Sequence, residues 1–108
     1  MKRGTVVWVN LEDAHPPEFG KTRPAVVVSN TEQNSLLDSV VVVPLSSRAP
    51  AIWPLRLGMP VVGKLNRSFA ITPGIRQIAN RRLVRAEGVV PQAVMDDLSA
   101  ALEAYLGD

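Results

Sequence analysis

One short segment contains a carboxylate and an arginine that could act together on a phosphate. The segment Glu18–Pro24 has the sequence E-F-G-K-T-R-P. Pro24 restricts Arg23 to an extended backbone, so the planar guanidinium of Arg23 can be presented to a phosphate. Glu18 can return across the loop toward it, and a carboxylate with an arginine can move a proton and stabilise an anion. The alternative interpretation is a structural ion pair at a barrel rim.

A second polar group directly follows an apolar run. Ser46, Ser47 and Arg48 come after Val40–Val43 and Pro44-Leu45. If this strand and the one that begins after Arg23 are antiparallel neighbours, the two ends meet, and hydroxyls and arginines converge as phosphate donors. The alternative interpretation is a polar turn.

Several kinds of chemistry are excluded or disfavoured. The chain has no cysteine, which excludes a disulfide scaffold, a thiol nucleophile and a cysteine-ligated metal. It has no glycine-rich phosphate loop and no G-x-S-x-G elbow. His15 lies near Glu12 and Asp13, but neighbouring carboxylates of one loop rarely converge on an ion. We therefore expect neither a metal nor a cofactor.

Charge is distributed unevenly along the 108 residues, although the net charge is only +2. Residues 1–44 carry four bases and five acids, residues 45–86 carry eight bases and no acid, and residues 87–108 carry five acids and no base. A basic middle segment predicts an anionic partner on one face.

The hydrophobic pattern predicts short strands. Val6–Val9, Ala25–Val28 and Val40–Val43 are rich in β-branched residues. We expect Trp8 in the core, and we expect Pro44 to end the third strand because proline cannot donate to a sheet ladder. Further strands are expected at Ile52–Leu57 (an edge or bulge, because of Pro54), Val61–Leu65 and Phe69–Thr72, with Ile75–Ile78 extending the last. Turns are expected at Asn30–Asn34 and, as a short helical turn, at Asn80–Leu83.

The last segment is helical in pattern. From Pro91 onward, apolar residues follow steps of three and four until Gly107: Val94, Met95, Leu98, Ala101, Leu102, Tyr105 and Leu106. Five to seven short strands with a C-terminal helix predict a single domain (1–108), mainly β, most simply a small SH3-like barrel, with an OB-fold as the competitor. The longest apolar run is Val40–Val43, far below the roughly 20 residues that span a bilayer. We expect a cytoplasmic protein that does not associate with membranes.

In order and spacing, nearly the whole chain resembles the MazF/PemK family, the endoribonuclease toxins of type II toxin–antitoxin systems. The resemblance rests on the opening K-R-G-T-V-V-W-V, on the Glu18–Pro24 run, on V-V-V-P-L-S-S at 41–47, on I-R-Q-I at 75–78 with R-R-L at 81–83, and on the C-terminal stripe. The pair E-x-x-x-x-R-P and P-x-[TS]-[TS] is its most specific part.

The resemblance implies a barrel of the MazF/PemK/CcdB type, a homodimer, and metal-independent cleavage of single-stranded RNA by 2′-OH attack. Arg23 would be the catalytic arginine, Ser46 would take the place of a catalytic threonine, and Glu18 would be the general base. The implied RNA contacts are Lys21, Thr22, Ser47, Arg48, Arg76 and Gln77, and the bases would stack on Phe19 and Trp53, unless these two rings only anchor their loops. The implied protein partner is an acidic cognate antitoxin.

Two departures from the family pattern bear on the site. Pro73 and Gly74 replace an acidic residue and a glutamine, and Gln77 replaces a threonine. We expect these changes to alter the recognised RNA sequence. Two alternative functions remain at this point: a non-catalytic RNA-binding or scaffold barrel, and a toxin of the same fold that poisons DNA gyrase.

Overall fold

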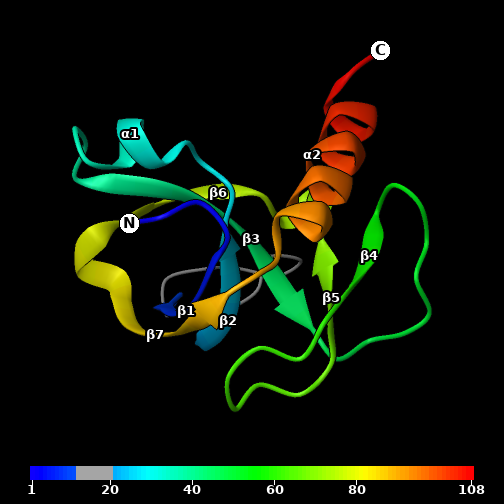
Figure 1. Cartoon of the computed structure of the whole chain (residues 1–108), viewed down its shortest axis with the longest axis horizontal. Coiled ribbons are helices and arrows are strands. Elements are labelled where there is room, and N and C mark those ends of the chain that lie inside the picture. The colour runs from blue at the N-terminus through cyan, green and yellow to red at the C-terminus, as the bar shows by residue number, and fades with distance from the viewer. Residues whose placement is uncertain (12–20) are drawn as a thin grey trace.

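The computed structural model describes residues 1–11 and 21–108. Within these residues the chain forms seven strands, and a fifteen-residue helix follows the last of them (Figure 1). The strands are β1 (Thr5–Asn10), β2 (Thr22–Val27), β3 (Ser39–Ser46), β4 (Arg56–Met59), β5 (Ser68–Ile71), β6 (Arg76–Ala79) and β7 (Leu83–Val89). The helices are α1 (Thr31–Asn34) and α2 (Gln92–Leu106), and two 3₁₀ turns, η1 (Thr72–Gly74) and η2 (Asn80–Arg82), flank β6.

All the strands pair antiparallel in one sheet of order β4-β5-β3-β2-β1-β7, and β6 pairs with β3 beside this path. In Figure 1 the strands curve around a common interior, and α2 covers one side. The prediction of a mainly β fold with a C-terminal helix is therefore confirmed. Of the helices in the described part of the chain, none is long and apolar enough to cross a membrane.

β3 is the longest strand and changes partners along its length. Its first half pairs with β6, the last such pair being Val42 with Arg76, and its end pairs with β5, beginning with Leu45 and Ala70. Pro44 lies between these two ladders and pairs with Ala25 of β2 on the other side. The prediction that Pro44 ends the strand was wrong, because the missing N–H falls where the strand changes partner.

The sheet has two buried faces. One face packs against α2 and β4 through Val26, Val43, Leu45, Met59 and Leu98. The other faces the curved interior through Val9, Ala25, Val27, Val42 and Ile78. At about 25 cal/mol for each Å² of apolar surface, burial on both faces explains the unbroken apolar runs Ala25–Val27 in β2 and Val40–Val43 in β3.

α2 begins after Pro91 and ends at Gly107, as the stripe predicts. Met95, Leu98 and Ala101 are fully buried, and the first two belong to the core that β2, β3 and β4 also line. The last turn departs from the prediction, since Tyr105 and Leu106 are 38% and 64% exposed. Figure 1 shows the reason: the helix projects past the sheet toward the C-terminus.

Five other segments differ from expectation. β7 was not predicted, because most of its side chains are at least partly exposed and its pattern is polar. Residues 61–65 form a turn with one bridge, Val62 to Leu65, around Gly63, whose φ is +56°.

Ile75–Ile78 does not extend β5, because η1 turns the chain back to pair with β3 as β6. The predicted strand at 52–57 begins only at Arg56, beyond Pro54, as the edge strand β4. Asn30 caps a short helix, α1, rather than a simple turn.

Trp8 was predicted in the core but is only half-buried, because its indole N–H binds a polar side chain on β7. Its Nε1–H donates to Glu87 Oε1 at 2.9 Å, and Arg85 lies 5.1 Å from the ring centre. The Lys64 backbone N–H donates to Glu87 Oε2 at 3.2 Å. Glu87 thus ties β1 and β7 to the turn around Gly63. The Trp8 and Lys64 hydrogen bonds, with a lesser contribution from Arg85, hold the pKa of Glu87 below its usual value, although burial acts in the opposite direction.

Glu87→Gln should therefore make folding stability less dependent on pH. A carboxylate whose pKa is lowered by folding stabilises the protein above its unfolded pKa, about 4.3 for glutamate, and this stabilisation is lost as the pH falls through the lower folded value. Thermal melts from pH 7 down to pH 3 should show a lower Tm for the variant at pH 7 and a shrinking difference toward pH 3. A difference in Tm that stays constant over this range would show that the charge of Glu87 has no part in stability.

Candidate active site

β2 and β3 separate at a defined point. Their ladder ends at the pair Ala25–Pro44. The Leu11 N–H donates to the Lys21 carbonyl at 2.7 Å, and bonding alternates along an antiparallel pair, so Pro24 turns its nitrogen toward β3. Proline has no N–H with which to continue the ladder. β3 therefore leaves β2 and pairs with β5, and the sheet opens between them.

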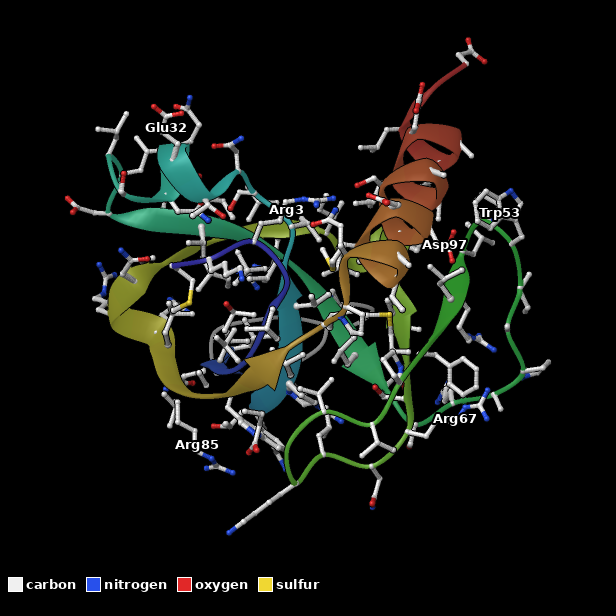
Figure 2. The ribbon with its side chains drawn as sticks, viewed as in Figure 1. Arg3, Glu32, Trp53, Arg67, Arg85 and Asp97 are labelled. Atoms are coloured by element: carbon white, nitrogen blue, oxygen red, sulfur yellow. The ribbon has the colours of Figure 1, made fainter. Side chains whose placement is uncertain are left out.

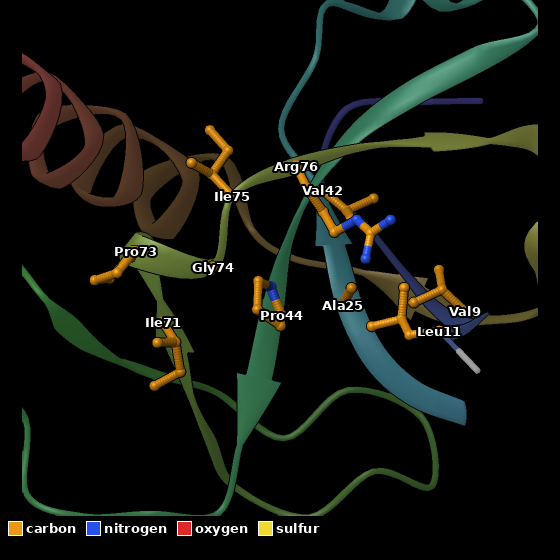
Figure 3. Close-up of a pocket in the computed structure, with 10 residues that line it drawn as sticks. All are labelled: Val9, Leu11, Ala25, Val42, Pro44, Ile71, Pro73, Gly74, Ile75 and Arg76. Atoms are coloured by element: carbon orange, nitrogen blue, oxygen red, sulfur yellow. The ribbon is translucent and has the colours of Figure 1, made fainter. Parts of the chain in front are cut away.

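A pocket of about 360 Å³ lies at this opening (Figure 3). Ala25, Val42 and Pro44 lie at its centre, and η1 contributes Pro73 and Gly74 on one side. Within residues 1–11 and 21–108, the lining consists of Val9, Leu11, Ala25, Val42, Pro44, Ile71, Pro73, Gly74, Ile75 and Arg76. Arg76 is the charged member of this set, and Figure 3 shows its side chain reaching from β6 toward Val9 and Leu11.

Three of the predicted site residues, Arg23, Ser46 and Arg76, belong to the face of the sheet on which the pocket lies. Side chains two residues apart on a strand share a face, so Arg23 lies on the face of Ala25, and Ser46 lies on the face of Pro44. Arg23 is also paired with Val9, which lines the pocket. If the β2–β3 register is continued by two residues past Ala25–Pro44, Arg23 comes opposite Ser46. The arginine and the hydroxyl therefore belong to the same face of the sheet as the pocket, just beyond the last paired residues of β2 and β3, although neither is among the described residues that line it.

The hydroxyl of Ser46 is oriented by the loop that follows β3. The Arg48 backbone N–H donates to Ser46 Oγ at 3.2 Å. This contact uses an acceptor site of the hydroxyl, which retains a proton to donate elsewhere. A serine lacks the β-branch that restricts the χ1 rotamer of threonine. The Arg48 amide supplies a comparable restraint by a different route.

The other predicted RNA contacts are spread more widely. Ser47 and Arg48 are exposed in the loop after β3. Thr22 pairs with Asn10, on the opposite face from Arg23, and Lys21, with φ +62°, precedes it. Gln77 lies on the opposite face of β6 from Arg76 and donates to Ser39 Oγ at 2.8 Å. These three side chains are not gathered at the pocket.

The two predicted stacking residues and the predicted base are placed differently again. Trp53 is 58% exposed, in the loop before β4, and Figure 2 shows it away from the end of β3. Glu18 and Phe19 lie outside the described residues, as do Glu12, Asp13 and His15. Among the residues that are described, no three His, Cys, Asp or Glu side chains come together as a metal site.

One residue of this face was missed by sequence reasoning. Phe69 of β5 is paired directly with Ser46. An aromatic residue within a predicted strand is expected in the core, and Phe69 is only half-buried. Its neighbour two residues on, Ile71, lines the pocket. Only the register between β3 and β5 reveals this position.

The arrangement suits an anion that carries an apolar group. The described lining of the pocket is apolar except for Arg76, and Arg23 and Ser46 belong to the same face of the sheet beyond it. Guanidinium groups bind phosphate oxygens with two parallel hydrogen bonds. Such donors stabilise charge most effectively next to a region from which water is excluded. The face can therefore hold a phosphodiester with a base beside it.

Residues 2–106 match a protein family described as PemK-like, MazF-like toxin of type II toxin–antitoxin system. The chain is 34% identical over 113 residues to the endoribonuclease MazF9 of Mycobacterium tuberculosis, a match that covers 98% of this chain and 96% of that protein.

Solved structures are similar as well. An endoribonuclease in complex with its cognate antitoxin from a mycobacterial species is 25% identical, with a TM-score of 0.82 over 99% of this chain and 95% of that one. MazF from Deinococcus radiodurans has the same fold, with 23% identity and a TM-score of 0.84 over 100% and 97% of the two chains.

Proposed function

Since the chain belongs to the PemK-like, MazF-like toxin family of type II toxin–antitoxin systems and is a homologue of an endoribonuclease MazF, we propose that it cleaves single-stranded RNA sequence-specifically and without a metal. The observation that carries this proposal is the shared face of Arg23, Ser46 and Arg76 around the pocket. Such groups can stabilise a phosphodiester in mid-reaction, and the resemblance of the two motifs to the family supports catalytic roles for Arg23 and Ser46.

The proposed reaction is an attack of the ribose 2′-oxygen on the neighbouring phosphorus. The 2′-O–P bond forms while the bond from phosphorus to the 5′-oxygen of the next nucleotide breaks. The products are a 2′,3′-cyclic phosphate and a 5′-hydroxyl. The proton of the 2′-OH passes to a base, for which Glu18 is our candidate, and the departing oxygen gains a proton from the acid that faces it, for which Arg23 is our candidate.

Charge stabilisation is the main contribution of this chain. The phosphorane carries extra negative charge on its non-bridging oxygens, which Arg23 and the Ser46 hydroxyl are placed to receive on one face. Arg76 would hold a neighbouring phosphate or base edge at the other side of the pocket. Lys21, Thr22, Gln77, Ser47, Arg48, Phe19 and Trp53 remain proposed RNA contacts outside this centre.

The proposed biological setting follows from the relatives. A mycobacterial relative is found in complex with its cognate antitoxin, and we propose that an acidic antitoxin binds this chain too, through the basic segment 45–86. An equimolar mixture of the protein and a candidate antitoxin should suppress RNA cleavage.

We also propose that the protein is a homodimer that acts in the cytoplasm. Light scattering of the purified protein should give twice the mass of one chain.

Excess EDTA should leave RNA cleavage unchanged. Because the proposed acid, base and anion donors are all side chains, no step needs a divalent ion. The test incubates purified protein with a long single-stranded RNA with and without 10 mM EDTA, at roughly a thousandfold excess over trace metal, and reads the fragments on a gel. Discrete bands of equal intensity in both lanes are expected.

A fully paired RNA of the same sequence serves as the matched control and should stay intact, because unpaired bases are the ones that can be splayed onto a protein surface. Intact single-stranded RNA in both lanes, with a folded protein, would leave a non-catalytic RNA-binding barrel. Cleavage that EDTA abolishes would contradict the metal-free mechanism.

A further inference from the structure

We propose that Phe69 forms a stacking platform for the base next to the reacting phosphate, with Arg67 beside it as a backbone contact. The inference rests on the proposed function for its position in the RNA, since it places the base relative to Ser46. It assigns a nucleotide subsite to the β4–β5 side of the opening, made by residues other than the two stacking residues that the sequence predicts.

The register places Phe69 beside the proposed chemistry. Phe69 pairs with Ser46 across β3 and β5, and with Gly58 across β5 and β4. Paired residues in an antiparallel sheet point to the same face, with neighbouring strands about 4.8 Å apart. Gly58, Phe69 and Ser46 therefore form a row across three strands.

The lining of the pocket confirms which face this row occupies. Ile71 and Pro44 both line the pocket. Each lies two residues from a member of the row, Ile71 from Phe69 and Pro44 from Ser46, and side chains at that spacing share a face. Phe69 thus points to the side of the sheet on which the pocket opens.

On β4, the residue paired with Phe69 is a glycine, which has no side chain to pack against the ring. A Cβ added at Gly58 would lie 3.8 Å from Phe69 Cε1 and 3.9 Å from Arg67 Nη2. The Phe69 ring and the Arg67 guanidinium therefore both lie next to Gly58. Phe69 is only half-buried, whereas Ala70, next to it on the opposite face, is completely buried. An aromatic residue on this face thus keeps part of its ring in solvent beside a glycine.

Arg67 adds a positive charge to this flank. It is exposed just before β5, and Figure 2 shows it at the side of the molecule where β3 ends. An exposed ring with an adjacent arginine is the combination by which proteins hold an unpaired nucleotide, with the base on the ring and a phosphate on the guanidinium. A base stacked on Phe69 would have its own phosphodiester within reach of Ser46, one strand away.

The test measures the affinity for single-stranded DNA, which has no 2′-OH and cannot be cut. Fluorescence anisotropy with a mixed-sequence 12-mer should show binding to Phe69→Leu weakened between about fivefold and about a hundredfold, the range for losing one base–aromatic stack. Phe69→Trp should restore the affinity, because the larger ring also stacks. Val84→Leu, an exposed apolar change on β7 (Val84 is 56% exposed), should bind as wild type does.

A 12-mer of abasic deoxyribose phosphates separates stacking from folding. Wild type and Phe69→Leu should bind it equally, since it offers no base to the ring. Equal binding of the base-bearing DNA by both proteins would overturn the subsite, and so would an equal loss with both oligonucleotides, which indicates a structural defect. DNA binding does not require catalysis, so a failure of the subsite leaves the RNA cleavage assay to judge the proposed function separately.

Discussion

Arg23→Ala should lower the rate of RNA cleavage by roughly 10³-fold, with Tm nearly unchanged. The side chain is proposed both to neutralise the phosphorane and to protonate the leaving oxygen, and a positioned proton donor alone contributes about 10²- to 10⁴-fold. Arg23 is exposed on β2, and substitutions at such positions usually change stability by less than about 0.5 kcal/mol. Single-turnover cleavage of a fluorescent RNA measures the rate, and a thermal melt verifies the fold.

Two further variants separate geometry from charge. Arg23→Lys keeps the charge but loses the planar fork and should recover only part of the rate. Arg81→Ala removes an exposed arginine from η2, outside the pocket, and serves as the matched control with wild-type cleavage. Cleavage by Arg23→Ala within threefold of wild type would remove Arg23 from the mechanism.

Ser46→Ala should slow cleavage by about 10²- to 10³-fold, the usual effect of removing one donor to a developing oxyanion. The hydroxyl lies on the pocket face, and its χ1 rotamer is held by the Arg48 amide. The KM should change much less than kcat, because the extra charge exists only in the transition state. Steady-state kinetics on a short RNA that contains one cut site would measure both constants.

Ser46→Thr supplies the matched control for this position. It retains the hydroxyl and adds the β-branch that serine lacks, so cleavage should be at least as fast as that of wild type. Unchanged cleavage by Ser46→Ala would show that the hydroxyl has no chemical role.

The sequence was sufficient for the strands and the helix whose burial is strong. β1, β2, β3 and α2 were predicted because their apolar patterns are long and regular. β7 was missed because an edge strand with exposed residues has no such pattern. The path through Pro44 was also missed, since a proline is compatible with a strand only where a neighbour is absent, and strand neighbours are set by the tertiary fold.

The sequence could suggest candidate residues for the site, but the face of the sheet on which each lies depends on the strand register. The motifs single out Arg23 and Ser46 as candidates, and the condition that their strands be antiparallel neighbours is met as far as Ala25–Pro44. The sequence could not assign the faces of β2 and β6, so Thr22 and Gln77 were grouped with residues that point the other way. Phe69 carries no motif, and its position opposite Ser46 follows only from the pairing of β3 with β5.

The arginines of the basic segment 45–86 likewise fall into two groups, those near the candidate site and those that contact other parts of the fold. Arg76 lines the pocket, and Arg67 lies next to Phe69. Arg85 instead contacts Trp8 and Glu87, at 3.3 Å from the carboxylate oxygen, and stabilises the fold. The charge pattern predicts an anionic partner, and the strand pairing selects Arg76 and Arg67 as the arginines of this segment that we propose to face it.

The central claim is that the nucleophile is the 2′-oxygen of the RNA itself. The most direct measurement compares an RNA that contains one cut site with the same RNA carrying a single 2′-deoxyribose on the 5′ side of that cut, and determines the fragment ends by mass spectrometry. We predict that the all-ribose RNA gives a 2′,3′-cyclic phosphate and a 5′-hydroxyl, and that the substituted RNA stays intact at that position. Cleavage of the substituted RNA, or a 5′-phosphate on the product, would contradict the account.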